Sequence, residues 1–233
     1  MNFISVLLKE LERSSPGSEA TARQVISLLG GVSPKSALFV GDDIITPDLI
    51  TERFGCALKA AFTEPFRAEQ GSAAGLDSST VQLFELPGEN GGYDLVWYNG
   101  IVEFDGCVQR LEQLRQKLKP GGTLVYRAVS WLTDPSPDTK LFCNRRFGKI
   151  LPLDKVLVLA KEQGYKVQDF YIAPKSDWYG GYYDPLIAAA ESYAGVHKED
   201  SAVSLGMSEL RKEYGIFEMH CEEYSCVYYI LKG

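Results

Sequence analysis

Two stretches decide the fold of this chain, Asp94-Leu-Val-Trp97 and Leu118-Lys-Pro-Gly-Gly-Thr-Leu-Val-Tyr126. Each contains a short apolar run of the kind found in buried strands. Between them, Val108, Leu111 and Leu114 repeat at helical spacing. In the second stretch the proline stops that helix, and two glycines permit positive φ before the chain enters the next strand. The order strand, helix, tight turn and strand predicts one unit of a parallel sheet.

Outside these stretches, short apolar runs alternate with helical periods, which is typical of a parallel sheet covered on both faces. Helices are predicted from Thr46 to Gly55 and from Leu153 to Gly164. We therefore expect an α/β fold with a doubly wound, mostly parallel, Rossmann-like sheet. The pattern predicts its seven strands at about residues 37–41, 57–62, 81–86, 93–98, 122–128, 166–172 and 224–231.

Two helices are expected before the first strand. Ile4, Leu7 and Leu11 lie on one helical face, and Ser18 is a candidate N-cap for the second helix. Two later connections, rich in Pro, Trp, Tyr and Gly, match no regular element of the sheet and predict a substrate lid. The expected organisation is one domain over 1–233, with helices at 1–34, a sheet core at 35–173 and 223–233, and an irregular lid at 174–222.

Composition excludes several classes of protein. The net charge is −7 and the basic residues are scattered, which argues against a nucleic-acid surface. The five cysteines lack metal-ligand spacing, and only two histidines accompany them, so no metal site and no disulfide framework are expected. No apolar run reaches about 18 residues, so no membrane span is expected. These features predict a cytoplasmic protein whose partners are a small molecule and, in a homodimer, a second copy of the chain.

Several segments in the correct order resemble class I S-adenosylmethionine (SAM) methyltransferases, specifically the small bacterial methyltransferase-domain 11/25 type. Besides the two stretches above, they are Pro16-Gly-Ser-Glu-Ala-Thr21, Asn99-Gly100, Val129-Ser-Trp-Leu-Thr-Asp134, Pro137, Trp178 and Tyr182-Tyr183 with Pro185-Leu186. The resemblance covers most of the chain. It implies a Rossmann-like methyltransferase fold that binds SAM at the carboxyl ends of the strands.

The cofactor loop departs from the family pattern. The family places an acidic residue and three glycines here so that backbone N–H groups can approach the cofactor. In this chain Phe39 replaces the acid, Gly41 remains, and Asp43 and Ile45 stand at the other glycine positions. Asp42 and Asp43 could attract the amino group or sulfonium of SAM, but they would repel its carboxylate. The alternative is an exposed acidic pair favoured by a helix N-terminus.

Further cofactor contacts are implied by the resemblance. The family's ribose-binding acid aligns with Phe62, and Glu64 lies two residues later, where a solvated loop carboxylate is the alternative. Glu85 is the candidate for the adenine contact. Asn99 and Gly100 match a position beside the methionyl group.

The substrate side is predicted from aromatic residues. Trp131, Trp178, Tyr182 and Tyr183 resemble the family's acceptor wall, although they could equally pack the lid onto the sheet. The pair Arg145-Arg146 is interpreted as solvated, with an anionic substrate as the alternative. No general base is identified, and catalytic residues stay unknown; methyl transfer needs mainly alignment, because the sulfonium is already activated.

Three functions follow from these residues. The first is a SAM-dependent methyltransferase that acts on a small-molecule acceptor. The second is a catalytically inactive binding or regulatory module that has lost SAM, a hypothesis that rests on Phe39, Asp43, Ile45 and Phe62. The third is a crevice that holds a cation or an amine against Asp42 and Asp43. Whether the chain is an active enzyme is left open by the sequence.

Overall fold

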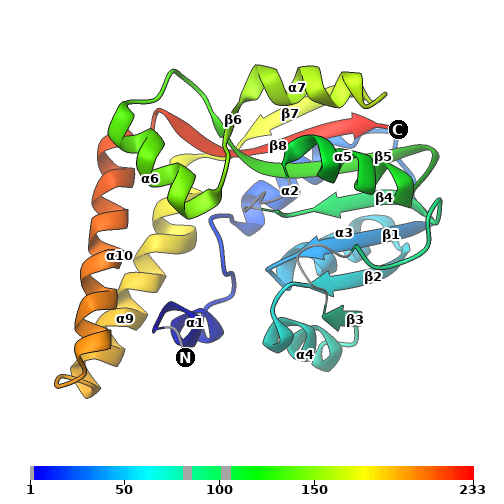
Figure 1. Cartoon of the computed structure of the whole chain (residues 1–233). Helices are drawn as coiled ribbons and strands as arrows, with labels where there is room; N and C mark the ends of the chain where they lie inside the picture. The colour runs from blue at the N-terminus through cyan, green and yellow to red at the C-terminus, as the bar shows by residue number, and fades with distance from the viewer. Residues whose placement is uncertain (1–2, 81–85, 101–105) are drawn as a thin grey trace.

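A computed structural model describes residues 3–80, 86–100 and 106–233 of the chain (Figure 1). Its centre is one mixed sheet with the strand order β3-β2-β1-β4-β5-β8-β7, and a short strand, β6, pairs with β5. All pairs are parallel except β5–β8 and β7–β8. The strands are β1 Ser36–Gly41, β2 Ala57–Phe62, β3 Asp77–Thr80, β4 Tyr93–Tyr98, β5 Leu118–Trp131, β6 Leu151–Pro152, β7 Lys166–Ile172 and β8 Tyr224–Lys232. The predicted doubly wound α/β fold is confirmed.

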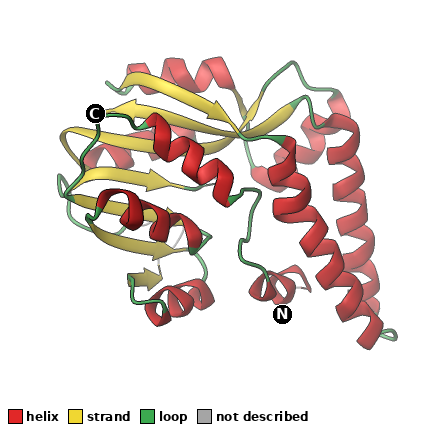
Figure 2. Ribbon diagram, turned by 180° about the vertical axis from the view of Figure 1, so that it is seen from behind, coloured by secondary structure: helices red, strands yellow, loops and turns green. Residues whose placement is uncertain are grey.

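Helices cover both faces of this sheet (Figure 2). Ser18 caps the second helix by accepting a hydrogen bond from the Thr21 N–H, as the sequence predicts. The helices are α1 Phe3–Leu7, η1 Leu8–Glu10, α2 Glu19–Leu28, α3 Ile45–Phe54, α4 Pro65–Ala73, α5 Cys107–Lys117, α6 Pro137–Phe147, α7 Leu153–Glu162, α8 Lys175–Trp178, η2 Tyr179–Tyr183, α9 Asp184–Val196 and α10 Ser201–His220.

Two apolar clusters hold these layers together. Side chains alternate along a strand, so neighbouring residues of β1 serve opposite faces. Phe39 packs with α2 and α3 on one face, whereas Leu38 and Val40 pack with α5 and α7 on the other. Because both faces are buried, the central strands are apolar throughout, which is why their runs are visible in the sequence.

The sequence-based expectation is wrong in two places, the segment 174–222 and the start of β5. The segment 174–222, expected as an irregular lid, forms α8, η2, α9 and α10, because its polar and aromatic residues complete helical faces that pack on one another. The edge strand is β3 at Asp77–Thr80, while the predicted strand at 81–86 falls almost wholly outside the described residues. Strand β5 begins at Leu118, directly after α5. Its register against β4 shifts between Tyr93 and Leu95, and the Pro-Gly-Gly residues lie within this shift.

The carboxyl ends of the parallel strands face the later helices. Figure 1 shows α9 and α10 side by side beyond the ends of β1 and β4, with α1 near their lower part. The segment that links α1 to α2 runs past the same strand ends. In the part of the chain that the structure describes, no helix is long and apolar enough to cross a membrane.

Candidate functional site

A cavity of about 310 Å³ lies at the carboxyl edge of the sheet, where the strand order reverses between β1 and β4. Ligands bind at this switch point in open α/β folds. Its lining comes from four regions of the chain: the N-terminal helices and their linker, the ends of β1, β2 and β4, helix α6, and η2. The described residues that line it are Ile4, Leu8, Ser14, Ser15, Pro16, Val40, Gly41, Asp42, Thr63, Glu64, Tyr98, Asn99, Gly100, Arg146, Phe147 and Tyr182.

Gly41 and Gly100 line the cavity, and neither position has room for a side chain. A Cβ on Gly41 would lie 2.5 Å from the Phe39 ring and 2.9 Å from Cβ of Asn99. A Cβ on Gly100 would lie 2.1 Å from the ring of Tyr98. The backbone of both strand ends is thus pressed against neighbouring side chains, and its other side faces the cavity.

Asp43 is a structural residue at the centre of a buried network. Its side chain is 1% exposed and accepts hydrogen bonds from the Thr46 N–H at 2.7 Å and from Asn99 Nδ2 at 2.9 Å. Arg13 Nη1 lies 3.3 Å from Oδ2, and Trp97 Nε1 donates to Asn99 Oδ1 at 2.7 Å. Asp43 therefore caps α3 and joins it to β4 and the N-terminal segment. Both the predicted cofactor contact and its exposed alternative are contradicted, because these buried partners occupy the carboxylate.

Asp42 faces the cavity. Its side chain is 13% exposed, and Oδ1 is buried without a hydrogen-bond partner among the described residues. The nearest cation is Arg127, whose Nη1 lies 3.9 Å from Oδ1. Burial raises the pKa of the Asp42 carboxyl, and Arg127 opposes that rise. The expected exposed acidic pair is therefore absent at Asp42 as well, since this carboxylate lies inside the site.

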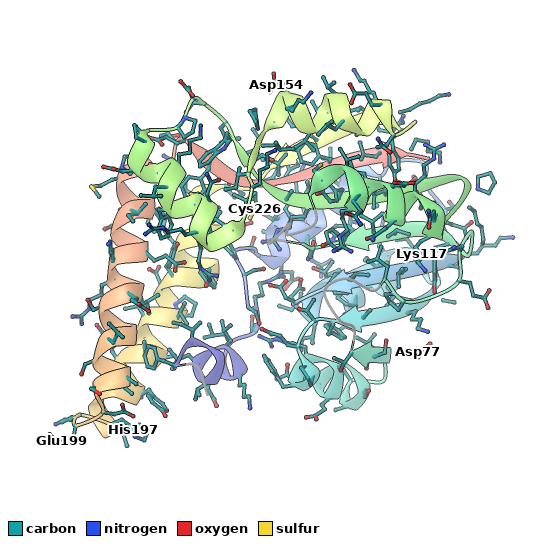
Figure 3. All side chains as sticks on the ribbon, viewed as in Figure 1. Asp77, Lys117, Asp154, His197, Glu199 and Cys226 are labelled. Carbon is teal, nitrogen blue, oxygen red and sulfur yellow. The ribbon has the colours of Figure 1, made fainter. Side chains whose placement is uncertain are left out.

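Arg127 fixes the N-terminal segment over the cavity. It is 1% exposed on β5, donates from Nη1 to Ser15 Oγ at 3.1 Å, and also donates to the Pro16 carbonyl oxygen. A further contact reaches Cys226 on β8, near the centre of Figure 3. The sequence analysis did not identify this arginine. The indication available was a charged residue inside an otherwise apolar strand.

The other predicted cofactor residues separate into two groups. Glu64 lines the cavity, accepts a hydrogen bond from Ser14 Oγ at 2.6 Å, and has its pKa raised by burial. It is therefore not the solvated loop carboxylate of the alternative interpretation. Phe62 is fully buried against Phe39 and does not line the cavity, because its position in β2 points into the α2 and α3 face. Glu85 lies outside the described residues.

Arg67 anchors the first helices to this site. It is 1% exposed and donates from Nη2 to the carbonyl oxygens of Leu8 at 3.1 Å and Leu11 at 2.6 Å. It thereby adds a partner to the Leu8 carbonyl, which already accepts from the Leu11 N–H, and also binds the carbonyl of Leu11. Leu8 and Ser14 consequently become walls of the cavity, a role that the sequence did not indicate.

Of the four aromatic residues predicted to line an acceptor site, Tyr182 alone is placed at the cavity. Trp178 and Tyr183 are fully buried, and Trp178 stacks on Phe217 of α10 with ring centroids 4.9 Å apart. Trp131 lines a separate cavity beside β6. For Trp178 and Tyr183 the predicted substrate contact is contradicted, because these rings fill the interface between α10, η2 and the sheet.

Arg146 enters the site from α6. Its Nε lies 3.2 Å from Glu213 Oε2, and its Nη2 donates to Tyr182 Oη at 3.2 Å. Arg145, next to it, is exposed. Arg146 is itself 38% exposed, but it is ion-paired and lines the cavity, so the interpretation of a solvated pair holds for Arg145 and only in part for Arg146.

No general base stands out at the cavity. His197 lies at the outer tip of the α9–α10 pair, beside Glu199 (Figure 3). Nδ1 of His220 is hydrogen-bonded to Glu223 at 2.8 Å, and neither histidine lines the cavity. Within the described residues, no cluster of His, Cys, Asp and Glu side chains could hold a metal ion.

No protein-family model matches this sequence, and no curated protein matches it. Solved structures do match over nearly its whole length. A SAM-dependent methyltransferase from Geobacter sulfurreducens, in complex with S-adenosyl-L-homocysteine (SAH), is 14% identical, with 99% of this chain and 98% of that chain covered and a TM-score of 0.76. A SAM-dependent methyltransferase from Thiobacillus denitrificans, also with SAH, is 16% identical, with 97% and 96% covered and a TM-score of 0.78.

A more distant match shows that the fold is compatible with different acceptors. The geranyl diphosphate C-methyltransferase from Streptomyces coelicolor A3(2), in complex with Mg²⁺, geranyl diphosphate and SAH, is 14% identical, with 91% of this chain and 78% of that chain covered and a TM-score of 0.59. At such low identities the likeness establishes the architecture. The chain therefore has the fold of class I SAM-dependent methyltransferases.

Proposed function

We propose that this protein is a SAM-dependent methyltransferase that binds its cofactor in the cavity at the ends of β1, β2 and β4 and acts on a small-molecule acceptor. The observation that carries the proposal is the position of Asp42. Its Oδ1 is buried, lacks a hydrogen-bond partner among the described residues, and belongs to a cavity at the switch point of the sheet. The part of the Asp42 side chain that stays exposed, 13%, belongs to the cavity lining, so the carboxylate could accept hydrogen bonds from a bound ammonium group.

The cavity residues fit the parts of SAM. Asp42 would accept hydrogen bonds from the amino group, and Glu64 would accept them from the ribose hydroxyls. Gly41 and Gly100 would allow the cofactor to approach the backbone closely. When bound, SAM supplies a methyl group that is already activated by its sulfonium charge. The protein then needs to hold the acceptor in line and exclude water.

The inactive-module alternative rested on residues that do not occupy the cavity. Phe39 and Phe62 pack in the core, and Asp43 is paired within the protein. Ile45 begins α3 and packs at the edge of the apolar cluster. None of these four side chains lines the proposed cofactor site. These four replacements therefore leave the proposed cofactor site unobstructed.

Calorimetric titration of the purified protein with SAH tests the proposal. SAH is the product of every SAM-dependent methyl transfer, so a working site should bind it with micromolar affinity. A folded protein that gives no binding heat at millimolar SAH would contradict the proposed function.

A further inference from the structure

The acceptor side of the cavity is separate from the cofactor side. Gly41, Asp42 and Glu64 belong to strand ends, whereas Arg146 and Tyr182 come from α6 and η2. These last two residues also line an adjoining cavity of about 270 Å³ against α9 and α10. Arg146 thus lies where the two cavities meet, and a methyl acceptor would pass it.

The guanidinium of Arg146 has hydrogen-bonding capacity left for a ligand. Its Nε is engaged by Glu213 and its Nη2 by Tyr182, both at 3.2 Å. No described residue accepts a hydrogen bond from Nη1. Glu213 is itself fixed, since it is 17% exposed and also accepts from Tyr183 Oη at 3.2 Å. The protein therefore holds the guanidinium in place and leaves Nη1 without an acceptor among the described residues, at a residue that lines the cavity.

The charged groups around Arg146 bear on the charge of the ligand that it could bind. Glu209 and Glu213 line the adjoining cavity and disfavour an anion there, whereas the carboxylates on the side of Phe147 would be engaged by the bound cofactor. Asp42 and Glu64 line that same side, and Arg146 is the arginine among its described lining residues. One cation among carboxylates suits a ligand with a single negative charge better than a dianion.

We propose that Arg146 binds a single carboxylate group on the methyl acceptor, through Nη1 on the Phe147 side of the cavity. The inference deepens the proposed function and rests on it, because the acceptor class has meaning only beside a bound cofactor. A carboxylate is favoured over a phosphate, which carries nearly two charges near neutral pH. Apolar walls from Ile4, Leu8 and Phe147 suit a hydrocarbon body attached to the carboxylate.

Benzoate and benzamide provide a matched pair of probes that differ in charge and are nearly equal in shape. Each would be titrated into wild-type protein saturated with SAH and followed by ligand-observed NMR. We expect benzoate to bind at least tenfold more tightly than benzamide, because only benzoate gains a charge-assisted hydrogen bond from Arg146. Phenyl phosphate should bind more weakly than benzoate. Equal affinities for the first two, no benzoate binding, or tighter binding of phenyl phosphate would each overturn the proposal.

Arg145 offers a matched control, since it carries the same charge one residue away and is exposed. Arg146→Gln should abolish the preference for benzoate, whereas Arg145→Gln should preserve it. Arg146→Lys keeps the positive charge but loses the forked N–H donors of the guanidinium, so it should keep part of the preference for benzoate. If Arg146→Gln does not fold, the wild-type pair of probes and Arg146→Lys still decide the question. A preference that survives in folded Arg146→Gln protein, or that is lost equally in Arg145→Gln, contradicts the assignment.

Titration with SAH alone separates this inference from the proposed function. Arg146→Gln should bind SAH within about twofold of wild type, because Arg146 lies on the acceptor side. Absence of SAH binding in wild type would contradict the proposed function itself. Normal SAH binding without discrimination between benzoate and benzamide would overturn only the role of Arg146.

Discussion

The strand ends after β1 and β4 both line the cavity, yet they are built in different ways. After β4, Asn99 and Gly100 keep the residues expected for this fold, and Gly100 is pressed onto the Tyr98 ring. After β1, two aspartates replace a flexible loop, and buried arginines from distant segments hold them. The comparison teaches that a strand end can lack two of the glycines in the family pattern and keep a defined backbone when charges elsewhere in the chain hold it.

Substitution of Arg127 should cause the largest loss of stability, because Arg127 supports the strand end after β1. Arg127→Met removes the cation beside Asp42 and the hydrogen bonds to Ser15 and Pro16. Removal of one partner from a buried charged network costs about 3–5 kcal/mol, which chemical denaturation would measure. The double variant Arg127→Met/Asp42→Asn should recover part of that loss, because no unpaired carboxylate remains. A loss below about 1 kcal/mol in the single variant would show that this arginine does not support the loop.

The substitutions Asp43→Asn and Asp42→Asn should lower the free energy of unfolding by different amounts. Asp43→Asn loses the ion pair with Arg13 and weakens the cap of α3, so we expect a loss of about 2–3 kcal/mol in the free energy of unfolding. Asp42→Asn weakens a 3.9 Å contact with Arg127 and a hydrogen bond with Ser15, and should cost about 1 kcal/mol. Urea denaturation of the two variants side by side measures the difference. Equal losses would contradict the assignment of one aspartate to the fold and the other to the site.

Gly41→Ala tests the close packing at the β1 end. The new methyl group would lie 2.5 Å from the Phe39 ring, so the strand end must shift, at a cost of about 1–3 kcal/mol. It should also weaken SAH binding, since the backbone moves toward the cavity. Gly31→Ala is the matched control, because nothing lies within 4 Å of its Cβ position. If both variants melt and bind SAH alike, the tight approach at Gly41 has no consequence.

Sequence reasoning succeeded where the relevant physics is local. Apolar runs placed β1, β2 and β4, and the rule for carboxyl ends brought Gly41, Glu64 and Asn99 to one cavity. It did not foresee that Asp42 and Asp43 are buried, because the groups that decide their environment are far away along the chain. Asn99 lies 56 residues from Asp43, and Arg127 reaches Ser15 across 112 residues.

The aromatic residues near 178–183 show the same limit. A run of Trp and Tyr has the composition of a substrate wall, but helical geometry sends successive side chains to different faces. Tyr182 faces the cavity, while Trp178 and Tyr183 pack against Phe217. The ion pair of Arg146 was not predicted, because its partner, Glu213, lies 67 residues away on another helix.

The smallest expected effect is a pH dependence from the two cavity carboxylates. Burial raises the pKa of Asp42 and of Glu64 above their unfolded values, so the folded state binds more protons over that interval. Their contribution to stability is therefore greatest below the unfolded pKa, about 4, and is lost as the pH rises through the folded values. Denaturation of wild type and Asp42→Asn/Glu64→Gln from pH 4 to 7 should give a more negative slope in wild type. Parallel profiles would contradict the raised pKa values.

The most direct test of the account compares SAH with 5′-methylthioadenosine, which lacks the amino acid part, on wild type and Asp42→Asn by calorimetry. If the aspartate after β1 holds the amino group, Asp42→Asn should weaken SAH binding at least tenfold and leave 5′-methylthioadenosine binding unchanged. Equal weakening of both ligands, or SAH binding that does not depend on Asp42, would contradict the claim that the altered loop is a working cofactor loop.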